Sequence, residues 1–230
     1  MTADDAAVDR SARPRRRWLT ALIAAAVLAA AALLGGAGGL LLAESLETPR
    51  GGADPNGVDV GFSQDMTVHH QQAVTLASWA RDHSEDAAIR RLAGDIEIGQ
   101  SDQIGRMQGW LGLWSRPSRA EGPPMTWMAG DEHTQHWTEP GQLMPGMATV
   151  AELERLRTLS GTDLDVYFLQ LMIRHHQGGG PMMRAAIDGA AVGEVTNLAE
   201  QMLDAQTAEI TTMTAMLTER GAEPLPPPRR

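Results

Sequence analysis

Residues 62–71 read FSQDMTVHHQ, and residues 168–177 read FLQLMIRHHQ. Each stretch carries a His-His pair, with a Met three residues and a Phe seven residues before the first His. Sliding the chain by 106 residues aligns residues 59–111 with 165–217 without a gap, and 16 of the 53 paired positions are identical. Ordinary composition gives about one identity in seventeen by chance. The chain therefore contains an internal duplication.

Both copies have apolar residues at helical spacing, which predicts helices at about 59–82 and 85–114 in the first copy and 163–188 and 192–219 in the second. Thr149 and Glu152 form a capping-box signature for a short helix at about 150–159. No segment has the pattern of a strand. Two hairpins joined by a long crossover predict an all-α four-helix bundle with pseudo-twofold packing. Such packing brings the two His pairs near each other.

The N-terminal region predicts a membrane anchor. Residues 1–17 are basic and precede an uncharged run at residues 18–43, which is long enough to span a bilayer. The alternative is a cleaved signal segment. Because arginines precede the run, we expect residues 1–17 to be cytoplasmic and residues 44–230 to lie outside the cell. Residues 44–57 read as a linker, and residues 222–230 form a Pro-rich tail.

Composition limits the chemistry of the exterior part. The residues after position 43 carry 26 acidic side chains against 14 arginines, and the chain contains no lysine. This charge argues against nucleic acid as a partner and is compatible with cations. The chain also has no cysteine, so neither disulfides nor thiolate ligands are available to it. A site for a soft metal here must use methionine and histidine.

The duplicated motif supplies both of these ligand types on one side of a helix. Met and His residues spaced by three and four positions can converge on one ion. Imidazole and thioether together suit Cu(I), and imidazole alone also suits Cu(II). An alternative is that the histidines are structural and hydrogen-bonded to Gln100 or Gln206. The predicted metal ligands are Met66, His69, His70, Met172, His175 and His176.

Two further features lie outside the duplicated motif. The Pro-rich crossover, residues 116–158, contains methionines that no predicted core demands, and these suggest a secondary metal site or an ordinary surface loop. The second copy contains the run Gly178-Gly179-Gly180-Pro181, which predicts a kinked or locally open helix just after its His pair. The secondary candidates are Met125, Met128, His133, His136, Met144 and Met147.

Several motifs together resemble the DUF305 family of bacterial extracytoplasmic proteins. They are FSQDMTVHHQQAV, GMATVAELERL, FLQLMIRHHQGG, QSDQIGRMQGWL and QTAEITTMTAML, and we expect the corresponding domain at residues 58–221. The resemblance implies a ferritin-like four-helix bundle, and some family members bind copper. The motif residues that carry over are the six Met and His named above. The Gly-Gly-Gly-Pro run and a crossover poorer in Met and His argue against high-capacity copper storage.

The sequence thus favours a membrane-anchored, outward-facing metal-binding protein that sequesters or transfers copper, in contact with a metal-handling partner of the cell envelope. One alternative is an interaction or sensor domain with structural His pairs. The other is a ferritin-like metalloenzyme, which would need a Glu-x-x-His motif that this chain lacks. We therefore expect no enzymatic activity. The sequence does not determine the oligomeric state.

Overall fold

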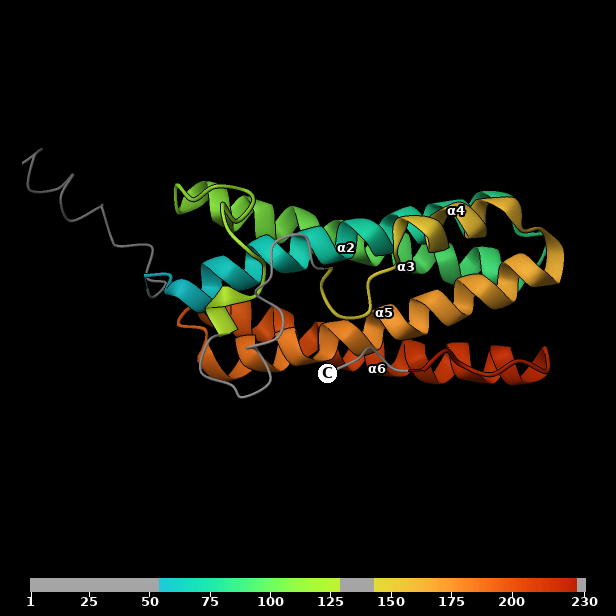
Figure 1. Ribbon diagram of the computed structural model, residues 1–230. Coiled ribbons are helices and arrows are strands. Elements are labelled where there is room, and N and C mark those ends of the chain that lie inside the picture. The colour runs from blue at the N-terminus through green and yellow to red at the C-terminus, as the bar shows by residue number, and fades with distance from the viewer. Residues whose placement is uncertain (1–53, 129–142, 227–230) are drawn as a thin grey trace, which may run out of the picture. The chain divides into compact units, whose positions relative to one another are not determined.

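The computed structural model describes residues 54–128 and 143–226. In these residues α2 (Gly57–His83) and α3 (Ala87–Leu113) form one antiparallel hairpin, and α5 (Gly161–Gly189) and α6 (Gly193–Glu219) form the other. The two hairpins pack through α2 and α5 (Figure 1). The crossover adds a short 3-10 helix, η1 (Thr126–Met128), and a short helix, α4 (Val150–Thr158).

The prediction of an all-α bundle built from two hairpins is confirmed for the described part of the chain, which contains no strand. The helix ends lie within one or two residues of those predicted. The predicted membrane helix at residues 18–43 lies outside the described residues. Among the helices that are described, none combines the length and the apolar character that a bilayer span requires.

Side-chain caps explain several of the helix starts. Asn56 accepts the backbone N–H groups of Val58 and Asp59, and so begins α2 with a capping box. Thr149 and Glu152 form the capping box that the sequence predicts for α4. Such caps satisfy N–H groups that have no partner inside the helix.

The duplicated aspartates tie the two hairpins together. Asp59 on α2 accepts the backbone N–H groups of Ala191 and Val192 in the α5–α6 turn, at 3.1 and 3.0 Å. Asp165 on α5 accepts the hydroxyl of Ser84 in the α2–α3 turn, at 2.6 Å. Each copy therefore holds the turn of the other, as pseudo-twofold packing requires.

Buried apolar side chains form two clusters. The Phe168 cluster includes Phe168 and Met172. The Phe62 cluster includes Phe62 and Met66. On all four long helices, polar residues lie between the members of the two clusters. We call this set the histidine layer: His69, His70, Gln100, Gln103, His175, His176, Gln206 and Glu209.

The crossover methionines belong to the core, and the expectation that no core demands them was wrong. Met125 and Met144 are buried in the Phe62 cluster. Met128 and Met147 are partly buried and pack against it. Periodicity could not predict this, because the crossover folds back onto the bundle as irregular chain. The other two crossover candidates, His133 and His136, lie outside the described residues.

The sequence predicts that α5 is kinked or locally open after its His pair. The local opening was wrong, because the helix runs without interruption from Gly161 to Gly189 with Pro181 inside it, and the kink stays a prediction. The glycines instead permit close packing. A Cβ atom on Gly178 would lie 2.0 Å from the carbonyl oxygen of Pro145. The crossover therefore lies directly on the backbone of α5 at this point, where it appears as the yellow segment beside α5 in Figure 1.

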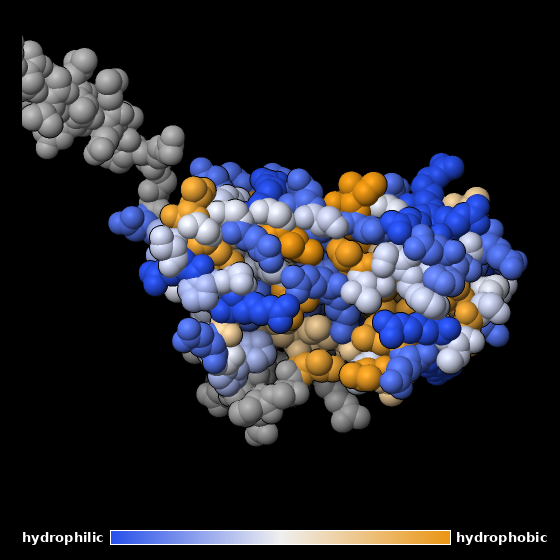
Figure 2. Space-filling view, turned by 90° about the horizontal axis from the view of Figure 1, so that it is seen from above, coloured by the Kyte–Doolittle hydropathy of each residue, from blue (hydrophilic) through white to orange (hydrophobic). Residues whose placement is uncertain are grey.

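The outer surface is largely polar. The face seen in Figure 2 is mostly hydrophilic, with hydrophobic residues in small separate patches. Ile98 and Leu113 are the most exposed large apolar side chains of the described residues, and both lie on α3. Scattered apolar residues of this kind are normal on a protein surface.

Candidate metal site

The two His pairs meet at the middle of the bundle. His69 and His70 lie on α2, and His175 and His176 lie on α5. All four side chains are buried. The rings of His69 and His175 are the closest, with centroids 3.8 Å apart and planes inclined by 38°. The pseudo-twofold relation explains this contact, because it brings equivalent positions of the two copies face to face.

The central rings bind backbone carbonyl groups. His69 Nε2 lies 3.1 Å from the carbonyl oxygen of Pro145, and His175 Nε2 lies 3.0 Å from that of His69. A carbonyl oxygen can only accept a hydrogen bond. In both rings Nε2 therefore carries the proton and donates.

The flanking rings bind side chains of the partner helix in their own hairpin. His70 Nε2 lies 2.8 Å from Gln103 Oε1 on α3. His176 Nε2 lies 2.5 Å from Glu209 Oε2 on α6. Both oxygens are acceptors, so Nε2 is again the donor. Gln103 and Glu209 are equivalent positions of the two copies, and each lies 33 residues after its histidine.

As a consequence, Nδ1 is the lone-pair atom of each of these rings in its neutral form. None of these four buried atoms has a hydrogen-bond partner among the described residues. A buried polar atom without a partner costs about 1–3 kcal/mol. Metal-binding histidines have this same arrangement, in which one ring N–H donates to a carbonyl or carboxylate and the other nitrogen binds the ion.

The alternative in which the histidines are structural predicts hydrogen bonds from them to Gln100 or Gln206. This predicted pairing is wrong. Both glutamines are buried, but neither the oxygen nor the nitrogen of either side-chain amide has a partner in the described residues. His70 and His176 bond instead to the residues three positions further along α3 and α6, and the other two histidines bond to backbone carbonyls. The layer therefore contains unpartnered amides as well as unpartnered imidazole nitrogens.

Burial keeps the imidazoles of His69, His70 and His175 uncharged. Loss of water around the charged form lowers the pKa of His69 to about 4 and the pKa of His70 to about 3. The pKa of His175 also lies well below its ordinary value, because of burial first and repulsion from the other histidines second. Neutral imidazole is the form that binds metal ions.

Among the residues that the structure describes, no three His, Asp or Glu side chains surround a single point. The motif methionines extend the set on either side, because Met66 lies in the Phe62 cluster and Met172 in the Phe168 cluster. Both are completely buried. The donor set is thus imidazole nitrogen with thioether sulfur close along the same helices, a combination that suits Cu(I).

A short strap closes the layer on the side where α2 meets α5. We use this name for residues 143–149, which precede α4. Its Pro145 carbonyl reaches His69, and Gly146 adopts a φ of 79°, a conformation that favours glycine. Gln72 holds the strap by bonding both backbone groups of Ala148. These contacts fix the acceptor that sets the tautomer of His69.

Arg174 secures the chain just after the strap. It forms a two-pronged ion pair with Glu152 on α4, at 2.7 and 2.8 Å. The guanidinium group is the largest cause that lowers the pKa of Glu152 to about 2. Paired contacts of this kind are among the stronger polar interactions. They attach α4 to α5 one residue before the second His pair.

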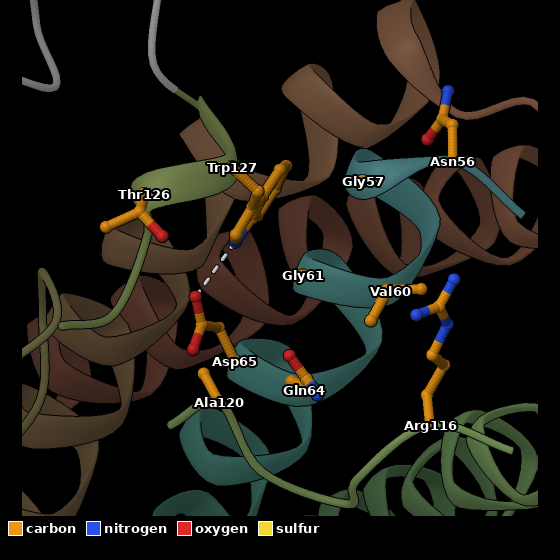
Figure 3. A pocket seen from close by; sticks show the side chains of 10 residues that line it. All are labelled: Asn56, Gly57, Val60, Gly61, Gln64, Asp65, Arg116, Ala120, Thr126 and Trp127. Carbon is orange, nitrogen blue, oxygen red and sulfur yellow. Dashed lines mark hydrogen bonds between the residues drawn. The ribbon is translucent and has the colours of Figure 1, made fainter. Parts of the chain in front are cut away.

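A separate pocket of about 330 Å³ lies at the start of α2. In Figure 3 the ring of Trp127 stands over Gly61, and its Nε1 donates to Asp65 Oδ2 at 2.8 Å. The backbone N–H of Met125 donates to the same oxygen at 2.6 Å. Burial raises the pKa of Asp65 above its usual value, against the effect of these two donors. With one carboxylate that already binds two donors, this pocket is a weaker metal candidate than the histidine layer.

Comparison with known proteins identifies the family. Residues 59–217 match the domain of unknown function called DUF305. This match spans more than half of the chain, so the protein belongs to the DUF305 family.

Solved structures share the fold. A DUF305 protein from Streptomyces coelicolor that is named as a secreted protein is 44% identical, with a TM-score of 0.66, over 74% of this chain and 97% of that one. CopM in its Cu(I)-bound form is 25% identical, with a TM-score of 0.54, over 70% of this chain and 96% of CopM. CopM in its Cu(II)-bound form is 26% identical, with a TM-score of 0.55, over 70% and 97%.

A curated relative matches one part of the chain. The uncharacterized protein L153 of Acanthamoeba polyphaga mimivirus is 34% identical over 53 residues. This match covers 23% of the present chain and 35% of L153, so the chain spans about a third of that relative's length.

Sequence reasoning missed the groups that orient the imidazoles. Gln103 and Glu209 differ between the two copies, so a search for identical positions passed over them. They were nevertheless detectable, because each lies three residues after a glutamine that both copies retain and so faces the same way. Pro145 could not have been found, because its backbone carbonyl reaches His69 only through the folded strap.

Proposed function

We propose that this protein binds copper in the histidine layer and sequesters it or passes it to a partner in the cell envelope. One observation carries the proposal. Four buried imidazoles each donate from Nε2 to a fixed oxygen and leave Nδ1 without a partner. The four unpartnered nitrogens lack only an acceptor of their lone pairs, and a metal ion is such an acceptor.

The donor set favours copper over harder cations. Neutral imidazole and thioether are poor ligands for Mg²⁺ or Ca²⁺, which prefer oxygen. Cu(I) accepts both donor types and can be bound by few ligands. We propose that His69 and His175 form the centre of the site. His70 and His176 flank it, and Met66 and Met172 supply thioethers.

The family relation supports copper as the ion. CopM, which shares the fold over 70% of this chain, has structures in Cu(I)-bound and Cu(II)-bound forms. The Streptomyces relative is named as a secreted protein, which supports an extracytoplasmic place for this domain. We further propose that residues 18–43 anchor it to the cell membrane, with residues 44–230 outside.

The test is to follow the imidazole nitrogens directly during metal titration. Ag(I), a diamagnetic substitute for Cu(I), is added to the purified full-length protein labelled with ¹⁵N, and histidine side-chain spectra are recorded. We expect the Nδ1 resonances of histidines in the layer to shift while Nε2 stays protonated. Copper titration should give the same stoichiometry, and His83 serves as the control because it lies outside the layer and contacts Trp79.

A matched set of variants separates a metal site from a structural role. His175→Gln should lower the affinity for Cu(I), whereas His83→Gln should leave it unchanged. Circular dichroism and thermal melting check that both variants fold. If neither Ag(I) nor Cu(I) perturbs any imidazole of the layer in the wild-type protein, the histidines are structural, and the interaction or sensor domain is the better interpretation.

A further inference from the structure

A groove between α5 and α6 leads to one side of the histidine layer. Its volume is about 230 Å³, and residues of both helices line it. His176 lines the groove, yet only 1% of this residue is exposed, so it lies at the bottom. Leu203 and Thr207 form part of the α6 wall.

The glycines of α5 leave the groove open. The atoms nearest to a Cβ on Gly180 would be those of the Arg184 guanidinium group, at 3.2 Å and beyond. A Cβ on Gly179 would lie 3.4 Å from His69 Cε1 and 3.4 Å from Gln206 Oε1. Gly179 thus faces the layer and Gly180 faces the groove. The equivalent positions in the first copy carry Ala73 and Val74.

The groove contains donors of three kinds. Met183 contributes a thioether, and its equivalent in the first copy is Ala77, which has none. Gln206 is 4% exposed, and its side-chain amide has no partner in the described residues. The unpartnered Nδ1 of His176 completes the set. Unpartnered buried groups that line a groove beside an imidazole indicate a path for a soft cation.

The two flanking histidines differ in what holds them. His176 donates to the carboxylate of Glu209, which is partly exposed, whereas His70 donates to the neutral amide of Gln103. A carboxylate on the far nitrogen increases the basicity of the ligating nitrogen and adds a negative charge beside a cation. The second copy therefore holds the stronger ligand next to the groove. Arg184 also lines the groove, and its positive charge is opposite in sign to that of the Glu209 carboxylate.

We infer that this groove is the port through which the ion reaches the histidine layer, and that His176, positioned by Glu209, is the first imidazole to bind it. The inference rests on the proposed copper function. It adds the route of the ion, which passes from the groove at His176 past Gly179 to His69 and His175. Glu209 is here a positioning residue that acts through His176.

Closing the groove tests the port. Gly180→Val copies the first copy's Val74, and the atoms nearest to its Cβ would be those at the end of the flexible Arg184 side chain. In the full-length protein we expect Cu(I) uptake from a chromogenic chelator, and its release, to slow about tenfold or more while equilibrium affinity stays unchanged. Val74→Gly is the matched control and should leave both rates unchanged. Uptake by Gly180→Val at the wild-type rate would overturn the port.

Exchanging the two positioning residues tests the order of binding. In wild-type protein, Ag(I) should shift the Nδ1 resonance of His176 at a lower metal ratio than that of His70. In Glu209→Gln, the His176 resonance should no longer shift before that of His70. The affinity of the first binding event should fall about tenfold or more, as expected for loss of an outer-shell partner. Gln103→Glu should make the Nδ1 resonance of His70 shift at the same metal ratio as that of His176. Thermal melting identifies any variant whose fold has changed.

The outcomes separate the two proposals. If wild-type protein binds neither Ag(I) nor Cu(I), the copper function fails and the port fails with it. If the imidazoles bind the ion but His70 shifts before His176, or Glu209→Gln changes neither order nor affinity, the copper function stands and only the role of His176 and Glu209 is overturned.

Discussion

Neutral, buried imidazoles link the stability of this bundle to pH. The pKa values of His69, His70 and His175 are lowered on folding, so below about pH 6.5 the unfolded chain binds more protons than the folded one. The stability is fully present above that pH and is lost as the pH falls toward about 4. Each histidine contributes a slope of about 1.4 kcal/mol per pH unit within this window.

Urea unfolding of the metal-free protein at several pH values measures this effect. We expect the free energy of unfolding to be nearly flat from pH 8 to 7 and to fall steeply from pH 6 to 5. His70→Gln should reduce the steepness by about a third, because one of the three contributing groups is removed. An unfolding free energy that stays constant between pH 7 and 5 would contradict the burial of uncharged rings.

Gly178 is the residue whose small size matters most for the strap. A Cβ there would lie 2.0 Å from the Pro145 oxygen and 2.6 Å from the Gly146 nitrogen, both of them backbone atoms. We expect Gly178→Ala to destabilise the protein by about 1–3 kcal/mol, as overpacking does. Gly105→Ala on α3 is the control, since nothing lies within 4 Å of its Cβ position. It should stabilise by roughly 0.5–1 kcal/mol. Equal denaturation midpoints for the two variants would rule out the close approach.

At the scale of elements, the mutual capping of the hairpins accounts for part of their association. Asp59 accepts two N–H groups of the opposite turn, whereas Asp165 accepts one hydroxyl. Removing Asp59 leaves backbone groups unsatisfied, and hydrogen bonds to charged groups contribute about 1.5–3 kcal/mol each. Backbone donors cannot turn to another partner as freely as a hydroxyl can.

We therefore expect Asp59→Ala to lower the free energy of unfolding by about 3 kcal/mol or more, and by clearly more than Asp165→Ala. Chemical denaturation monitored by circular dichroism measures both variants. The slope of the transition should stay unchanged if the native bundle keeps its compactness. The opposite ranking of the two variants would show that the turn contacts do not hold the hairpins together.

At the scale of the whole molecule, we predict that the N-terminal run places the domain at the cell membrane. Residues 18–43 are uncharged and follow five arginines. We expect the protein to remain in the membrane fraction, with residues 44–230 accessible to protease from outside the cell. Fractionation and N-terminal sequencing of the mature protein provide the measurement. A soluble protein that begins near Glu44 would contradict the anchor and indicate a cleaved signal.

The sequence by itself determined the duplication, the helices and the burial of the motif, because each is a local or periodic property. Phe62 and Met66 share a stripe with the position of the His pair, and the 106-residue offset carries that stripe into the second copy. A repeat that must bury the same face twice predicts a bundle with its motifs at the centre.

Only the tertiary structure decided the state of each imidazole, because hydrogen-bond partners are set by contacts between distant segments. Pro145 reaches His69 across 76 residues, and no periodicity encodes the path of the strap. The roles of the crossover methionines and of Gly178 were misread for the same reason: both depend on irregular chain that packs back onto α5. Helical patterns fix which face is buried, but the positions of single polar atoms depend on the complete packing around them.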